Sequence, residues 1–190
     1  MLSRILSFGN ICMQCYPITV ECDTVSAMTE VTDIVGLPDA AVRESKERVR
    51  AAINNTGLCF PSARITLSLA PADLKKEGAV YDLPILLAIL QSDGQLEFNA
   101  ENKAFVGEIS LAGEIRPVRG ILPMVITAKE MGLSEIYIPF DNAAEASVVE
   151  GINAFAVKNI TELIDHLTGK IPLSPVLHSG WTAPSWIYPG

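Results

Sequence analysis

The apolar run LPILLAIL at residues 83–90 constrains the fold more than any other part of this sequence. As a helix it would be apolar on nearly every side, whereas a surface helix keeps one polar face. Such a helix has to be enclosed by other elements, so the chain must build layers around it. With 190 residues, 49% of them apolar and 19% charged, the chain is long enough to supply that core and is not disordered.

The residues around this run alternate between strand and helix patterns. Alternating or β-rich stretches predict strands, the first two paired with each other, at residues 16–22, 28–35, 64–70, 135–139 and 154–157. Helical spacing and capping residues predict further helices at residues 40–54, 120–131, 142–149 and 161–167. Residues 104–111 and 114–118 flank Ala112-Gly113, which is a hairpin signal. The mixture indicates an α+β or α/β fold and leaves the order of the strands open.

One domain is expected at residues 1–170. From Ile171 the sequence IPLSPVLHSGWTAPSWIYPG is rich in proline, contains both tryptophans and has no periodic pattern. We expect residues 171–190 to be a linker or a tail added for expression, and not part of the fold.

The charge and the apolar patterning set limits on location and partners. A net charge of -8 argues against broad capture of nucleic acid or anionic membrane by this chain. No apolar stretch reaches the roughly 18 residues of a membrane helix, and the first residues lack the pattern of a secretory signal. We therefore expect a cytoplasmic protein that makes no membrane contact.

The cysteines give no metal site. Cys12 and Cys15 have the spacing of a redox pair or of half a zinc site, but no second pair accompanies them. The two histidines, His166 and His178, are far away in the sequence. We expect reduced thiols and no metal, with a redox pair as the alternative.

Four segments carry a resemblance to a known family. They are VGLPDAAVRESKERVRAAI (35–53), LAPADLKKEGAVYDLPILLAIL (69–90), VGEISLAGEIRPVRGILP (106–123) and IPFDNAAEASVVEG (138–151). Residues 1–170 resemble the N-terminal domain of the bacterial ComM/YifB family, competence-related AAA+ ATPases that are called magnesium chelatase-like. The resemblance implies a fold like the second domain of ribosomal protein S5, which is also the fold of the Lon peptidase domain. For the full-length relatives it implies homo-hexamers that drive branch migration of DNA during natural transformation.

The ATPase motor of this family is not expected in this chain. A phosphate-binding loop needs a glycine-rich turn before Gly-Lys-Ser/Thr. Here Gly169-Lys170 is followed by Ile171, and Ile164 occupies the place of the first glycine. The resemblance therefore implies that ATP and Mg bind in a module outside this chain, and we expect no cofactor here.

The resemblance to Lon also indicates where a peptidase dyad would lie. Lon-type peptidases use a serine nucleophile that a lysine activates. Along residues 75–82 the serine position falls on Val80, and along residues 107–122 the lysine position falls on Leu122. Since an aliphatic side chain neither attacks nor accepts a proton, we expect no peptidase. The alternative is a Lon-like serine hydrolase with a relocated nucleophile.

The expected function is therefore a non-catalytic assembly and interaction domain of such an ATPase. If the two Lon-like loops are neighbours, they would form a basic lip, for a DNA phosphate or an acidic partner, from Lys75, Lys76, Arg116 and Arg119. The alternative is ordinary solvated charge, because four acidic residues lie nearby in the sequence, Glu77, Asp82, Glu108 and Glu114.

Overall fold

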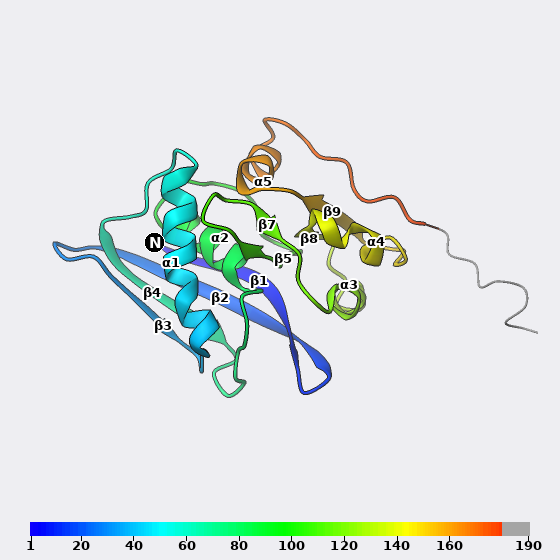
Figure 1. Ribbon diagram of the computed structural model, residues 1–190, viewed down its shortest axis with the longest axis horizontal. Helices are drawn as coiled ribbons and strands as arrows, with labels where there is room; N and C mark the ends of the chain where they lie inside the picture. The colour runs from blue at the N-terminus through cyan, green and yellow to red at the C-terminus, as the bar shows by residue number, and fades with distance from the viewer. Residues whose placement is uncertain (180–190) are drawn as a thin grey trace, which may run out of the picture.

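The computed structural model describes residues 1–179 as one large mixed sheet covered by helices (Figure 1). The order of the sheet is β3-β4-β2-β1-β5-β8-β9. Its strands, in chain order, are β1 (Leu2–Ile11), β2 (Gln14–Ser26), β3 (Val31–Val35), β4 (Ala63–Ala70), β5 (Lys103–Phe105), β8 (Glu135–Pro139) and β9 (Asn153–Val157). A separate two-stranded sheet pairs β6 (Glu108–Ile109) with β7 (Ile115–Arg116). The helices are α1 (Ala40–Asn55), α2 (Asp82–Ser92), α3 (Ile121–Glu130), η1 (Phe140–Asn142), α4 (Ala143–Ala146) and α5 (Ile160–Leu167).

The large sheet is parallel on the β5 side of β1, and on the other side it is antiparallel except for the parallel edge pair β3–β4. β1 pairs with β2 as a long antiparallel hairpin, and β2 pairs antiparallel with β4. The pairs β1–β5, β5–β8, β8–β9 and β3–β4 are parallel. This mixed and mostly parallel sheet with helices confirms the expected α/β or α+β class.

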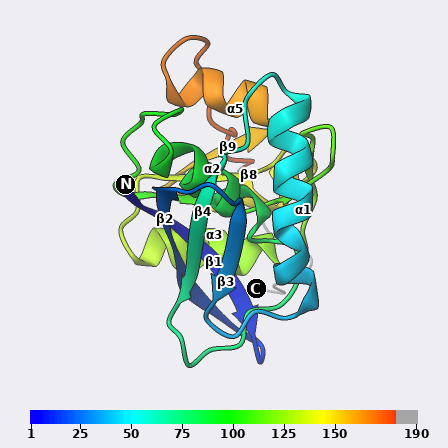
Figure 2. The same ribbon diagram turned by 90° about the vertical axis from the view of Figure 1, so that its left-hand side faces the viewer.

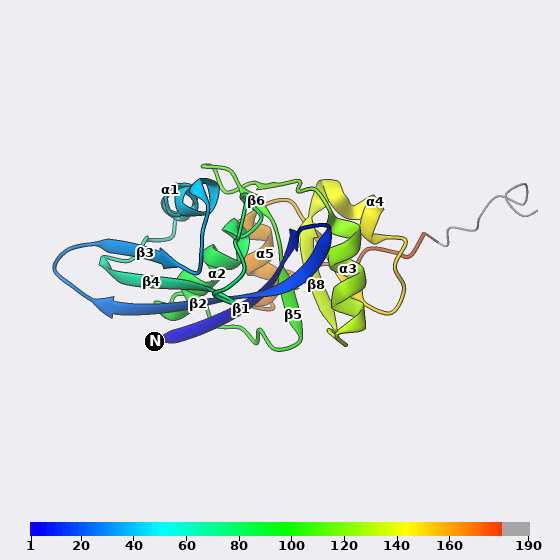
Figure 3. The same ribbon diagram turned by 90° about the horizontal axis from the view of Figure 1, so that it is seen from below.

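Two hydrophobic cores lie on opposite faces of the sheet. One core contains the buried residues of α1, α2 and α5, and the other contains those of α3 and α4. Figure 2 shows α1 running alongside β2, β3 and β4. Figure 3 shows α3 and α4 beyond β1, beside the parallel strands, where α3 also contacts β2, while no helix of residues 1–179 covers the outer face of β3 and β4.

Helix α2 is the centre of the first core, as its apolar run predicts. Every residue from Asp82 to Leu90 is buried. Each aliphatic side chain that is fully buried contributes roughly 1.5–3 kcal/mol relative to an exposed one. The helix also contacts β1 through the hydroxyl of Ser3, which donates to the carbonyl of Ala88 (2.6 Å).

Two sequence-based expectations about strands are wrong. The segments 16–22 and 28–35 are not paired, because β4 lies between β2 and β3. β3, α1 and β4 form a β-α-β unit, so β3 and β4 must be parallel neighbours. The predicted strand 104–111 is two strands, since β5 joins the large sheet and only β6 forms the hairpin with β7.

Strand β1 was not predicted from the sequence. Its buried positions include Ser3, Ser7 and Gly9, which interrupt the apolar alternation that marks a strand. Gly9 is required by packing, because a side chain there would collide with the hydroxyl of Tyr81.

The end of the described chain runs along the parallel side of the sheet. The amide of Leu173 donates to Nδ1 of His166 (2.8 Å), and the amide of Val176 donates to the carbonyl of Ala154 in β9 (2.7 Å). The identity of residues 171–190 as a linker or an added tail stays a prediction, and residues 180–190 lie outside the described residues. Within residues 1–179, none of the helices combines the length and apolarity that crossing a bilayer requires.

Candidate functional site

The loop before α2 is held by a buried lysine. Lys76 is fully buried, and its ammonium donates to the carbonyl of Gly36 (2.8 Å) and to that of Pro71. Its backbone adds two more bonds, from its amide to the carbonyl of Leu37 (3.0 Å) and from the amide of Asp39 to its carbonyl (2.9 Å). Lys76 therefore fastens the loop to the connection between β3 and α1.

The burial of Lys76 has an electrostatic cost. Removal from water lowers the pKa of its amine below the ordinary lysine value, and the nearby Asp73 carboxylate opposes that shift. The two carbonyl oxygens offset part of the cost by accepting hydrogen bonds. In this conformation Lys76 offers no charge to a partner at the surface.

Asp39 ties the same loop to the start of α1. Its Oδ1 accepts from the amide of Val42 (2.8 Å), which caps the helix, and its Oδ2 accepts from the amide of Gly78 (3.1 Å). Gly78 has φ of 85°, a left-handed conformation in which glycine is unstrained. The turn that leads to Val80 thus has a defined shape.

Asp82 is a buried hub between α1, α2 and β6. It accepts from Ser45 Oγ (2.6 Å), from Arg48 Nε (2.7 Å) and Nη2 (3.0 Å), and from the amide of Ile109 (3.1 Å). The hydrogen bond to Asp82 raises the pKa of the Arg48 guanidinium, while burial opposes that shift. A fully satisfied buried carboxylate of this kind fixes how neighbouring elements pack.

A pocket of about 380 Å³ lies where the Lon-like loops meet, and we call it the Val80 pocket. It is lined by Asn10, Glu77, Gly78, Ala79, Val80, Glu108, Pro117, Val118, Arg119 and Met124. These lining residues include no hydroxyl, thiol, imidazole or lysine amine. As placed, the pocket offers neither a nucleophile nor a base of the Ser-Lys kind.

Leu122, at the expected position of the base, lines another pocket. It is 36% exposed near the start of α3, and its pocket is shared with Ile126, Val148 and His178. The structure therefore does not bring Val80 and Leu122 together in one pocket. The hydroxyl of Ser110, in the segment that carries Glu108, is buried and accepts from the amide of Glu114 (3.0 Å), so it serves the turn between β6 and β7.

The four residues of the expected basic lip lie in different surroundings. Lys75 is exposed and pairs with Glu77 (3.6 Å), while Lys76 is buried. Arg119 lines the Val80 pocket, and Arg116 lines a neighbouring pocket that shares Pro117 with it. A contact of Lys75, Arg116 and Arg119 with DNA or with a partner stays a prediction.

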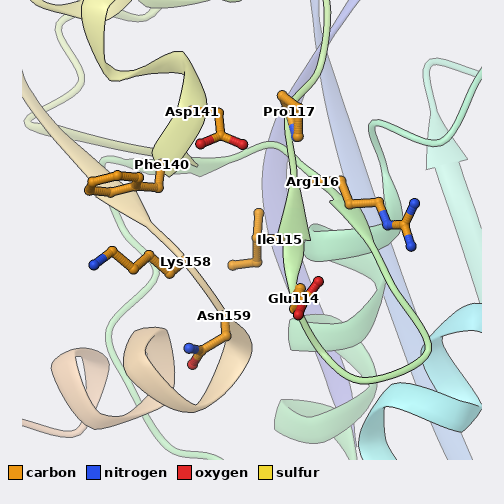
Figure 4. A pocket seen from close by; sticks show the side chains of 8 residues that line it. All are labelled: Glu114, Ile115, Arg116, Pro117, Phe140, Asp141, Lys158 and Asn159. Atoms are coloured by element: carbon orange, nitrogen blue, oxygen red, sulfur yellow. The ribbon is translucent and has the colours of Figure 1, made fainter.

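This neighbouring pocket, which we call the Phe140 pocket, has a volume of about 400 Å³ (Figure 4). It is lined by Glu114, Ile115, Arg116, Pro117, Phe140, Asp141, Lys158 and Asn159. The residues come from β7 and its two flanking residues, from η1, and from the connection between β9 and α5. Sequence reasoning missed the pocket, because only the fold brings these three segments together.

The cysteines are free thiols in the structure. Cys12 is exposed at the turn between β1 and β2, and burial raises the pKa of Cys15 although Thr127 opposes the shift. A redox pair works through a thiol of lowered pKa. The surroundings of Cys15 therefore favour the expectation of ordinary reduced thiols over the alternative.

Comparison with known proteins identifies similar chains. An uncharacterized protein of Mycobacterium tuberculosis is 42% identical over 168 residues, which are 88% of this chain and 33% of that protein. Competence protein ComM of Haemophilus influenzae is 39% identical over 144 residues, 74% of this chain and 28% of ComM. The uncharacterized protein YifB of Escherichia coli is 38% identical over 155 residues, 81% of this chain and 30% of YifB. The chain thus spans about a third of the length of these relatives.

A shorter similarity and a family model complete the comparison. Lon protease 2 of Bacillus subtilis is 37% identical over 65 residues, 34% of this chain and 12% of that protease. The family model described as subunit ChlI of Mg-chelatase matches residues 20–142, which include the loop of Lys76, the Asp82 hub and most of both pockets. The chain therefore belongs to this ChlI family of magnesium chelatase-like proteins, as an N-terminal domain of the ComM/YifB kind.

Proposed function

We propose that this chain is a non-catalytic assembly and interaction domain of a magnesium chelatase-related AAA+ ATPase. The observation that carries the proposal is the Val80 pocket. Its surroundings are held in a defined shape by Lys76, Asp39 and Asp82, yet its lining presents no hydroxyl, thiol or lysine amine for a Ser-Lys type of catalysis. A pocket with a fixed frame but without the side chains of a Ser-Lys dyad suits binding or assembly better than hydrolysis.

The fold we propose is that of the second domain of ribosomal protein S5, shared with the Lon peptidase domain. The similarity to Lon protease 2 supports it, as does the mixed sheet with its β6–β7 hairpin beside the Val80 pocket. In this proposal the domain descends from a peptidase scaffold and serves another purpose.

The cellular setting follows from the relatives. Since they are about three times as long as the matched region, we place the ATP and Mg sites in a part that this chain does not supply. The name of ComM refers to competence. In the proposed setting the domain helps to assemble a hexameric cytoplasmic ATPase that drives DNA branch migration during natural transformation.

A serine-reactive fluorophosphonate probe tests the absence of hydrolysis. The folded chain should remain unlabelled under conditions that label a Lon peptidase completely, and it should not degrade casein. Labelling of a single serine, lost when that serine is replaced by alanine, would overturn the proposal in favour of the hydrolase with a relocated nucleophile.

Titration with branched and single-stranded DNA at low and moderate salt tests the nucleic-acid contact. If the exposed basic residues bind phosphates, Arg116→Met and Arg119→Met should each weaken binding and reduce the salt slope by about one unit. The same affinity in both variants would show that these arginines make no such contact. A lack of binding even at low salt would leave assembly as the role of the domain.

A further inference from the structure

The Phe140 pocket is rigidly framed by hydrogen bonds between its three segments. The amide of Ile115 donates to the carbonyl of Lys158 (2.9 Å), and the amide of Ile160 donates to that of Gly113 (2.9 Å). On the opposite side Asn142 accepts from the amide of Val118 (3.0 Å) and donates to its carbonyl (2.9 Å). A pocket whose walls are already fixed loses little conformational entropy when a ligand enters.

The side chains divide into those at the opening and those that point away from it. Figure 4 shows the Asp141 carboxylate between the Phe140 ring and Pro117, above the side chain of Ile115. In the same view Lys158 lies below the ring, and the guanidinium of Arg116 points to the opposite side. The Lys158 ammonium is 4.7 Å from the centroid of the ring. The opening of the pocket is therefore aromatic, apolar and acidic, with its two cations at the sides.

Apart from the contact of the Lys158 ammonium with the Phe140 ring, the charges around this opening make no ion pairs among the described residues. Among the ion pairs of residues 1–179, none involves Glu114, Arg116, Asp141 or Lys158. Phe140 is 47% exposed, which is unusual for an aromatic side chain beside a framed pocket. An exposed ring next to an unpaired carboxylate is a typical receptor for a cation.

We propose that the Phe140 pocket receives an arginine side chain of a partner protein. A guanidinium is planar, so it can stack on the Phe140 ring while it donates two parallel hydrogen bonds to the Asp141 carboxylate. Its methylene groups would contact Ile115 and Pro117. The inference rests on the proposed interaction role and gives it a partner chemistry, a protein surface with an exposed arginine.

Charge favours a basic protein segment over a nucleic acid at this place. A phosphate would have to approach Glu114 and Asp141, while the Lys158 ammonium is engaged with the ring and Arg116 points away. The whole chain also carries a net charge of -8, which attracts basic surfaces.

The test is a nuclear magnetic resonance titration of the full chain labelled with nitrogen-15. N-acetyl-arginine amide is added first, and its neutral counterpart N-acetyl-citrulline amide serves as the control. The arginine probe should shift the amide signals of residues 114–116, 140–141 and 158–159 in a saturable way, and the citrulline probe should not. Shifts that are equal for both probes, or that lie elsewhere in the chain, would overturn the proposal.

Two variants of the same pocket, one that removes a negative charge and one that removes a positive charge, test whether the pocket binds a cation. Asp141→Asn should weaken arginine binding by about two- to fivefold, the effect of losing one exposed charge pair. Lys158→Met removes a cation from the same pocket and should leave the affinity unchanged or increase it. An unchanged affinity in Asp141→Asn, or a loss in Lys158→Met, would contradict the proposal.

A titration with nucleic acid distinguishes the proposed arginine ligand from a phosphate ligand. A short oligothymidylate should not shift the signals of the Phe140 pocket. If it shifts them, and if Lys158→Met abolishes those shifts, the pocket is a phosphate site and the proposal fails. The proposed lack of hydrolysis is judged separately by fluorophosphonate labelling, so the failure of one inference is distinguishable from the failure of the other.

Discussion

Two buried charged residues at the entrance to α2, Lys76 and Asp82, and the charged residues around the Phe140 pocket are satisfied in opposite ways. In the first region Lys76 and Asp82 are fully buried, and groups of the same chain meet their hydrogen-bonding needs. In the second region Asp141 and Glu114 are exposed and have no ion-pair partner among the described residues. The difference teaches that internally paired charge holds the shape of this domain, whereas unpaired charge on a fixed frame is available to a partner.

The largest expected effect comes from breaking the Asp82 hub. Asp82→Asn leaves Arg48 without its buried counter-charge, and the loss of one partner of such a pair costs about 3 kcal/mol or more. Glu44→Gln is the matched control, because Glu44 pairs with the same arginine at 3.8 Å but is 68% exposed. Its effect on the free energy of unfolding, measured with urea, should stay below about 0.5 kcal/mol. Similar values for the two variants would contradict the contrast between the regions.

The second largest loss of stability is expected from replacing Lys76, with the adjacent Lys75 as the control. Lys76→Met removes the donor to the carbonyls of Gly36 and Pro71, and it should lower the free energy of unfolding by about 1 to 2 kcal/mol. Lys75→Met should have almost no effect, because Lys75 is exposed and its partner Glu77 is exposed as well. Urea denaturation of both variants provides the measurement, and an equal loss in both would show that burial is not the cause.

The contribution of Lys76 to stability should change with pH, by less than the effects above and in a defined direction. Because burial lowers the pKa of its amine in the folded protein, the unfolded chain binds more protons between that lowered pKa and the ordinary value of about 10.4. The stability of the wild type relative to Lys76→Met should therefore rise as the pH passes through this interval. Paired urea titrations at neutral pH and at about pH 10 measure it, and a relative stability that falls would mean that the pKa is raised instead.

The smallest effect on stability is expected at the Phe140 pocket. Asp141→Asn should change the free energy of unfolding by less than about 0.5 kcal/mol, since Asp141 forms no ion pair among the described residues. Lys158→Met should lower it by at most about 1 kcal/mol, since Lys158 loses only its exposed contact with the Phe140 ring. Thermal unfolding followed by circular dichroism is sufficient to measure this. A loss of stability as large as that of Lys76→Met would place these residues with the internally paired group.

The helices could be predicted from the sequence because their signals are local. Asp39 followed by a helical apolar pattern predicts α1, and the structure shows the carboxylate of Asp39 capping the amide of Val42. The all-round apolar run predicts α2 as a central helix, and the structure confirms it. Such signals depend on residues within one or two turns of each other.

The features that were missed depend on contacts between distant segments. Lys76 resembles a surface residue in the sequence. The carbonyls of Gly36 and Pro71 accept its hydrogen bonds, and the sequence alone does not show that the fold brings Gly36 close to Lys76. The Phe140 pocket has no local pattern, since Ile115, Phe140 and Lys158 come from different elements. The pairing of β2 with β4 follows from the β-α-β unit and not from any residue in the turn after β2.

The position of β1 has a consequence for biosynthesis. The β1–β2 hairpin is complete once Ser26 has been made, but the other neighbour of β1, strand β5, begins only at Lys103. At typical rates of translation this leaves one edge of β1 unpaired for on the order of ten seconds. During that time the nascent hairpin exposes a strand edge, and charged Arg4 together with Ser3 and Ser7 gives it polar side chains that discourage pairing with other nascent chains.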